Sequence, residues 1–180
     1  SISSVSKMEV ITKTKENQTG SKTVIHVGET IEHISTGCPD GTTMIVRDLF
    51  FNTPARLKFM KSDSAESSAV IDFAAQMALA YPEIRIRMIS NGNILFSTRG
   101  TGDRRKVIMT LSGNDPSMKL LPLEITEGNI YVSGYISGPG ESKASRKGQI
   151  YFVNGRAISS KILEKAVDSA YSDRLFEGRF

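Results

Sequence analysis

The sequence predicts an α/β or α+β protein in which helices pack on a mixed sheet. Two observations support this class. Short runs of alternating or β-branched residues recur along the chain, and three stretches carry apolar residues at helical spacing after residue 62. The 180 residues are 39% hydrophobic, so the chain can bury a core as one domain or two small ones.

The first part of the chain is predicted to consist of strands joined by loops. The predicted strands cover residues 8–14, 23–27, 30–35 and 42–46. Polar or turn-forming residues separate them at 15–21 and 37–41. The first predicted strand alternates apolar residues, Met8 and Val10, with polar ones, Glu9, Thr12 and Lys13. This pattern predicts one apolar and one polar face.

A boundary is predicted at Ser62-Asp63-Ser64, where a polar stretch precedes a helix. Asp63 and Glu66 have the spacing of a capping box, and Pro82 ends the helix. One face of this helix is predicted to be core, and it carries Val70, Phe73, Ala74, Met77, Ala78 and Tyr81.

Hairpins and two further helices follow. Asn91-Gly92 predicts a tight turn between strands, and a second hairpin covers residues 120–136. Asp103 caps a short helix, Gln149–Val153 is a strand, and Ser159 or Ser160 caps the last helix. A flexible basic loop opens at Gly138-Pro139-Gly140.

Several classes of site are disfavoured by composition. The chain has one cysteine, Cys38, so it cannot form an internal disulfide or a multi-cysteine zinc site. It has only two histidines, and no metal site is predicted. No run of about 18 apolar residues exists, so no membrane helix is expected. The start lacks a signal peptide and an initiator Met, which suggests a processed or excised piece. No Walker loop or dinucleotide fingerprint is present, and no catalytic residue is assigned.

The net charge of +4 is unevenly distributed. Basic clusters occur at Arg99, Arg104, Arg105 and Lys106, and at Lys143, Arg146 and Lys147. Such clusters attract polyanions, but a single basic cluster is more often an ordinary solvated surface; two clusters and Arg156 in one chain favour a nucleic-acid surface modestly.

The segment Gly41–Phe59 is predicted to be a strand followed by a compact turn, which we call the elbow. Pro54 fixes its own φ, and Asn52 can form side-chain turn bonds. Leu49, Phe50 and Phe59 are expected to bury the elbow. A purely structural corner would account for all of these residues.

The same segment resembles a nucleotide-site motif of the MutL mismatch-repair family, G-T-T-x-x-V-x-D-L-F-x-N-T-P-A-R-x-K-F. Ser1–Val5 resembles the end of that family's G-F-R-G-E-A-L-x-S-I-x-S-V motif, and Tyr151–Arg156 resembles its F-V-N-G-R signature. The resemblance extends over all 180 residues. It places the chain in the gyrase, chaperone, histidine-kinase and MutL (GHKL) ATPase superfamily.

The resemblance implies two modules. Residues 1–61 would be the C-terminal part of a GHKL-type ATPase α/β sandwich. Residues 62–180 would be a transducer domain similar to domain 2 of ribosomal protein S5, truncated at its C-terminus. The parent protein would couple ATP binding and slow hydrolysis to DNA binding and partner recruitment. It would be cytoplasmic and nucleoid-associated if bacterial.

The resemblance also implies site residues. Thr42, with Gly41 beside it, would lie near the adenine of ATP, and Thr43 is the alternative. DNA phosphates would be held by Lys143, Arg146, Lys147 and Arg156. Asn154 and Arg156 would lie on a strand toward the ATPase module, where an interface role is equally open.

The chain itself is expected to be inactive. In the family, the catalytic Glu and the Mg²⁺-holding Asn precede residue 1 of this chain, and the lysine that reaches the γ-phosphate follows Phe180. ATP and Mg²⁺ would therefore serve the parent protein, and neither is expected to bind this piece tightly. Expected partners are non-specific DNA, mismatch-recognition and downstream repair proteins, and a second copy of the full-length protein. The alternative is a protein-interaction module without its own DNA binding.

Overall fold

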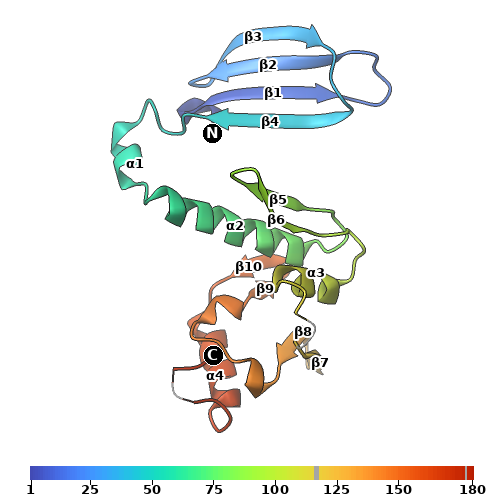
Figure 1. Cartoon of the computed structure of the whole chain (residues 1–180), viewed down its shortest axis with the longest axis vertical. Helices are drawn as coiled ribbons and strands as arrows, with labels where there is room; N and C mark the ends of the chain where they lie inside the picture. The colour runs from blue at the N-terminus through green and yellow to red at the C-terminus, as the bar shows by residue number, and fades with distance from the viewer. Residues whose placement is uncertain (116–117, 177) are drawn as a thin grey trace. The chain divides into compact units, whose positions relative to one another are not determined.

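The computed structural model describes residues 1–115, 118–176 and 178–180. The chain forms two compact units, Ser1–Glu66 and Ser67–Phe180 (Figure 1). The predicted boundary at Ser62 falls directly before the helix that this division crosses. Within the described residues, no helix has both the length and the hydrophobicity that a membrane span requires.

The first unit is built on one four-stranded antiparallel sheet with the order β3-β2-β1-β4 (Figure 1). A short 3-10 turn, η1 (Ser3–Val5), precedes it. Its strands are β1 (Lys7–Lys13), β2 (Gly20–His26), β3 (Glu29–Thr36) and β4 (Gly41–Arg47). The four strands lie where they were predicted, although β2 begins inside the predicted 15–21 turn.

Side chains alternate between the two faces of this sheet because successive residues of a strand point to opposite sides. What we call the charged face carries Lys22 near Glu9 and Glu32, at 3.6 and 3.9 Å, and Arg47 2.6 Å from Glu9. The hydrogen bond from Arg47 holds the pKa of Glu9 below its ordinary value.

The opposite side, which we call the apolar face, carries Met8 and Val10 of β1 and their register partners. Those partners are Ile25, Thr23, Val46 and Met44. Thr12 lies on the apolar face as well, since it follows Val10 by two positions. Its predicted place among the polar residues Glu9 and Lys13 is therefore wrong, because the strand keeps its alternation without a bulge at that point.

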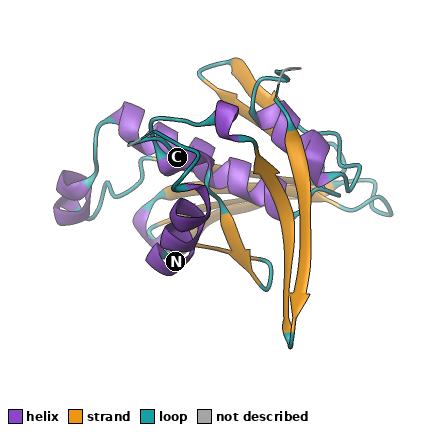
Figure 2. Ribbon diagram, turned by 90° about the horizontal axis from the view of Figure 1, so that it is seen from below, coloured by secondary structure: helices purple, strands orange, loops and turns teal. Residues whose placement is uncertain are grey.

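The second unit combines helices with two-stranded hairpins (Figure 2). Its helices are α2 (Asp63–Ala80, which begins in the first unit), α3 (Arg104–Leu111) and α4 (Lys161–Tyr171). Its strands are β5 (Arg87–Ser90), β6 (Asn93–Ser97), β7 (Leu120–Glu127), β8 (Ile130–Ser137), β9 (Tyr151–Val153) and β10 (Arg156–Ile158). Two 3-10 turns, η2 (Pro139–Glu141) and η3 (Arg146–Gly148), lie in the predicted loop.

Every strand pair in the described residues is antiparallel, so these residues do not form the predicted mixed sheet. In the second unit each pair joins strands that are neighbours in sequence, and hairpins are antiparallel by construction. The strand β10 is not among the predicted strands; Asn154-Gly155 forms the Asn-Gly turn that joins it to β9.

Capping residues define the helix starts. Asp103 accepts a hydrogen bond from Lys106 N at 3.2 Å, and Ser160 accepts one from Leu163 N at 3.4 Å, as predicted. For α2 the prediction is shifted by one residue. Ser62 Oγ accepts from Ala65 N at 3.4 Å, and Glu66 accepts from Lys61 N at 2.9 Å.

The core of the second unit joins α2, β6 and α3. Its buried apolar residues are Ala78, Leu79, Phe96 and Val107. The predicted core stripe of α2 is wrong for four of its six residues, because Val70, Phe73, Met77 and Tyr81 are exposed; only Ala78 is buried and Ala74 partly buried. Apolar residues occur around much of this helix, so spacing alone did not identify the buried side.

We predict that Phe96→Ala lowers the free energy of unfolding by about 3–5 kcal/mol, because it leaves a cavity in this core. Leu95→Ala is the matched control, since Leu95 is the neighbouring residue on β6 and is 46% exposed. Leu95→Ala should lower the free energy of unfolding by less than about 1 kcal/mol. Denaturant unfolding measures both values, and similar losses in the two variants would show that the core is misassigned.

Candidate functional site

The predicted nucleotide residues lie at the start of β4. Thr42 is the register partner of Thr12 on β1, and both side chains lie on the apolar face. Their hydroxyl oxygens are 2.8 Å apart. Thr12 Oγ1 also donates to the carbonyl of Gly41 at 3.3 Å. The hydroxyl of Thr42 is thus held at the edge of an apolar surface that includes Val10 and Met44.

Thr43 lies on the other side of the sheet. Its register partner is Ile11, which shares the charged face with Lys22. Because adjacent residues of a strand point to opposite faces, Thr42 and Thr43 cannot line the same surface. By the same alternation, Gly41 and Thr43 lie on the charged face, with Lys13 and Ile11 as their register partners, and only Thr42 lies on the apolar face.

Gly41 is required by its backbone conformation. Its φ is +109°, a value that residues with a side chain rarely adopt. A Cβ at this position would meet no atom within 4 Å. The space beside Gly41 is therefore open, and nothing in the first unit fills it.

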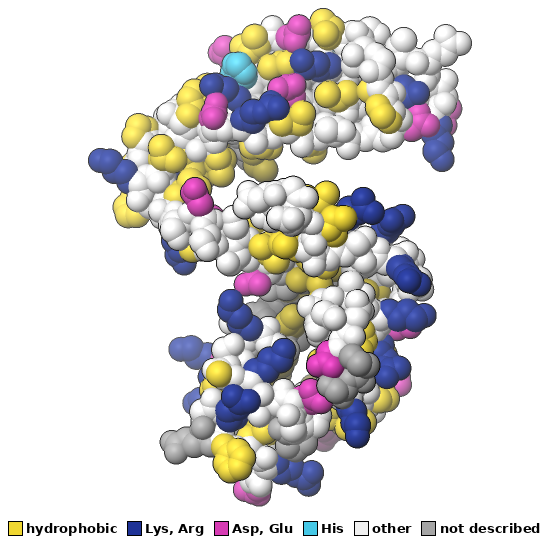
Figure 3. Space-filling model, viewed as in Figure 1, with side chains coloured by type: hydrophobic (Ala, Val, Ile, Leu, Met, Phe, Trp, Pro, Cys, Tyr) yellow, Lys and Arg dark blue, Asp and Glu magenta, His cyan; other side chains and the backbone are white. Residues whose placement is uncertain are grey.

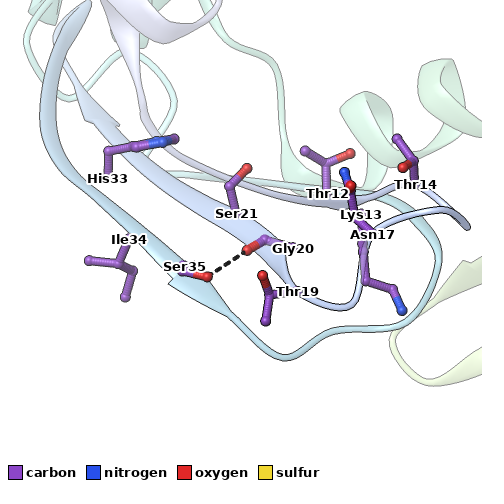
Figure 4. A pocket seen from close by; sticks show the side chains of 10 residues that line it. All are labelled: Thr12, Lys13, Thr14, Asn17, Thr19, Gly20, Ser21, His33, Ile34 and Ser35. Atoms are coloured by element: carbon purple, nitrogen blue, oxygen red, sulfur yellow. Dashed lines mark hydrogen bonds between the residues drawn. The ribbon is translucent and has the colours of Figure 1, made fainter.

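Thr12 also borders a hollow of about 290 Å³ at the end of the sheet, between β1, β2 and β3 (Figure 4). Half of its ten lining residues carry a hydroxyl group, namely Thr12, Thr14, Thr19, Ser21 and Ser35. Thr12 is not among the site residues predicted from the sequence. Strict two-residue alternation from Met8 and Val10 would have placed it on the apolar face beside Thr42.

The elbow after β4 is tied to the N-terminus of the chain. Phe50 N donates to the carbonyl of Val5 at 2.7 Å, and Asn52 Nδ2 donates to the carbonyl of Ser4 at 3.0 Å. Two motifs that are far apart in the sequence, Ser1–Val5 and Gly41–Phe59, are therefore in direct contact.

The backbone of the elbow is strained, with φ values of +53° at Asp48 and +65° at Phe50. Lys7 Nζ lies 2.8 Å from Asp48 and also contacts the ring of Phe51. This ammonium group lowers the pKa of Asp48. The ion pair and the backbone bonds together hold the turn.

The prediction that Leu49 and Phe59 bury the elbow is wrong. Leu49 is 39% exposed and Phe59 is 87% exposed. Phe59 belongs to a short helix that was not predicted, α1 (Pro54–Phe59), none of whose residues is buried. Proline at the first helical position favours this start, since its missing N–H is not needed there.

Three of the predicted DNA contacts, Lys143, Arg146 and Lys147, lie in or beside η3. We call this segment, residues 143–147, the basic loop. Arg146 is already engaged. Its guanidinium lies 2.6 Å from the Asp168 carboxylate of α4 and stacks on the ring of Phe180, 3.7 Å from the centroid.

The basic loop is also held by its backbone, because Lys143 and Phe180 exchange two N–H···O bonds of 2.7 and 2.9 Å. Lys147 is exposed, and within the described residues it makes no ion pair. Lys143 is exposed as well and makes no ion pair within the described residues, so both lysines are available to an external anion, whereas Arg146 has an internal carboxylate partner.

The F-V-N-G-R motif forms the β9–β10 hairpin. Asn154 and Gly155 occupy its turn with φ values of +49° and +78°, so the expectation that Asn154 lies on a strand is wrong. Arg156 is the first residue of β10 and is exposed. No hydrogen bond or ion pair within the described ranges joins it to the basic loop.

The second basic cluster is only partly available. Arg104 Nε donates to the carbonyl of Leu79 at 3.1 Å, and Lys106 lies 3.2 Å from Asp103. Arg99 and Arg105 are exposed. Lys and Arg side chains are scattered over the visible face of the second unit, with acidic and apolar side chains between them (Figure 3).

No group of three or more His, Cys, Asp or Glu side chains within residues 1–115, 118–176 and 178–180 is arranged to hold a metal ion.

Comparison with known proteins gives consistent matches. Residues 108–180 match the family described as DNA mismatch repair protein, C-terminal domain. Over the whole chain, the identity is 37% to the DNA mismatch repair protein MutL of Agathobacter rectalis and 41% to that of Streptococcus pyogenes. The chain spans only 28% and 27% of the length of these relatives.

Solved structures match as well. The Aquifex aeolicus MutL ATPase domain complexed with ADP superposes with a TM-score of 0.78 and 25% identity, over 93% of this chain and 65% of that chain. A second structure of the ATPase domain from that organism's mismatch repair endonuclease MutL gives a TM-score of 0.77 and 27% identity, over 98% of this chain and 66% of that chain. Together with the three motifs, these matches show that the chain belongs to the MutL family of DNA mismatch repair proteins and has part of the fold of its ATPase domain.

Proposed function

We propose that this chain is a piece of a MutL-type protein that couples ATP binding and hydrolysis to DNA binding and to the recruitment of repair partners. In this proposal, residues 1–61 are the C-terminal part of the ATPase domain and residues 62–180 are the transducer domain. The observation that carries the proposal is the match, over 93% of this chain, to a MutL ATPase domain complexed with ADP.

The geometry at the start of β4 supports a nucleotide site. Thr42 offers a hydroxyl beside the apolar surface that includes Val10 and Met44. A flat purine ring suits such a surface, because an apolar wall covers the ring face while a polar group orients its edge. Thr42 is our candidate for that polar group.

The described residues do not fit a Mg²⁺ site, because they hold no group of three or more Asp, Glu, His or Cys side chains arranged for a metal ion. We therefore derive no step through the metal, which is proposed for the parent protein alone. The solved ATPase domains that match are longer than this chain, which covers 65–66% of them. We propose that hydrolysis needs residues outside this chain and that the chain by itself is inactive.

The basic loop supports DNA binding. Lys147 is exposed, and Lys143 and Arg156 are further candidates. Phosphate contacts by such side chains carry no base specificity, and their strength falls with salt.

An alternative function is a protein-interaction module, and the pairing of Arg146 with Asp168 favours it by reducing the free positive charge of the loop. Mismatch-recognition and downstream repair proteins, and a second copy of the full-length protein, are the proposed partners. The proposed location is the cytoplasm, with nucleoid association.

We predict that Thr42→Val in the full-length protein weakens ADP binding about fivefold to tenfold, because one hydrogen bond to the base is lost. Thr43→Val is the matched control, since Thr43 lies on the charged face. It should change the ADP affinity by less than about twofold. Isothermal titration calorimetry measures both constants, and the reverse pattern would show that Thr42 is not the nucleotide residue.

We predict that Lys147→Glu weakens binding to a labelled duplex of mixed sequence and lowers the slope of log affinity against log salt by about 1. Lys15→Glu makes the same charge change in the exposed 14–19 turn and should have no such effect. Fluorescence anisotropy at several salt concentrations gives the slope. If the two variants bind alike, or if binding does not depend on salt, the DNA assignment fails and the protein-interaction alternative stands.

A further inference from the structure

We infer that Thr12 is a positioning residue that makes the hydroxyl of Thr42 a hydrogen-bond acceptor, and that this polarity selects adenine over guanine nucleotides. The inference rests on the nucleotide site proposed at Thr42. It assigns a role to Thr12, a residue outside the three sequence motifs.

The polarity follows from two contacts of one hydroxyl group. Thr12 Oγ1 lies 2.8 Å from Thr42 Oγ1 and 3.3 Å from the carbonyl oxygen of Gly41. A carbonyl oxygen can only accept, and a hydroxyl has a single hydrogen to donate. The one arrangement that satisfies both contacts has Thr12 donating to Gly41 and Thr42 donating to Thr12.

The hydrogen of Thr42 is then used within the sheet. Only the lone pairs of its oxygen can then meet a ligand, so Thr42 accepts and does not donate. At the same ring position, adenine carries an amino group and guanine carries a carbonyl oxygen. The amino group can donate to Thr42, whereas the carbonyl would face another acceptor and remain unpaired. Sites that leave polar groups unpaired discriminate strongly between such ligands.

The sheet holds this arrangement in place. Thr12 and Thr42 are register partners in the β1–β4 ladder, so the backbone fixes the separation of their side chains. Both are β-branched, which restricts rotation about their first side-chain bond. Thr12 is also half-buried, next to the hydroxyl-rich hollow. The direction of the Thr42 hydroxyl is therefore set before any ligand arrives.

The experiment measures the dissociation constants of ADP and GDP for the full-length protein by isothermal titration calorimetry. Thr12→Val keeps the shape of the side chain and removes its hydroxyl. Without that acceptor, the Thr42 hydroxyl can rotate and donate to a carbonyl. We expect the preference for ADP over GDP to fall at least about fivefold, while Thr12→Ser retains it. Thr23→Val is the control, because Thr23 lies on the same face but bonds to His33.

Each result decides the question. Thr12→Ala is measured beside Thr12→Val, so that a packing defect in one variant does not mask the effect, and thermal melting confirms that both are folded. If both retain the wild-type preference while Thr42→Val lowers it, Thr42 contacts the base and the role of Thr12 is overturned. If Thr42→Val changes neither constant, the proposed nucleotide site fails and this inference fails with it.

Discussion

The antiparallel register of β1 on β4 is the constraint on which the first unit depends. It pairs Thr12 with Thr42 and Met8 with Val46, and it sends Thr43 and Glu9 to the opposite face. A slip of one residue would exchange the two faces of β4, so that Thr43 in place of Thr42 would stand beside Met8 and Val10. The same ladder that stabilises the sheet therefore decides which hydroxyl stands beside the apolar surface.

The elbow after β4 shows how motifs that are distant in sequence form one structural element. Asn52 and Phe50 each contribute one hydrogen bond to the carbonyls of η1, and Lys7 pairs with Asp48. These contacts hold positive φ angles that the elbow would not adopt alone. Much of the motif thus builds a corner, and a smaller part, at Thr42, is the contact that we propose for the nucleotide.

The basic loop illustrates why a list of cations is a poor guide to an anion site. Lys143, Arg146 and Lys147 are equivalent in a charge count, yet Arg146 has a carboxylate on one side and an aromatic ring on the other. Its contacts tie η3 to α4 and to the end of the chain. The exposed lysines beside Arg146 have no internal carboxylate partner and can bind an external anion. Contacts made in the tertiary structure therefore decide which cations of the loop are available.

The sequence alone determined the strands of the first unit, the caps at Asp103 and Ser160, and the family, because alternation, capping and motif spacing are local properties. Only the tertiary structure decided which side of α2 is buried, that Arg146 is paired with Asp168, and that Thr12 stands against Thr42. Each of these depends on residues more than ten positions apart. Whether such residues meet depends on the packing of helices and strands and on strand register. Local sequence patterns do not predict either of these.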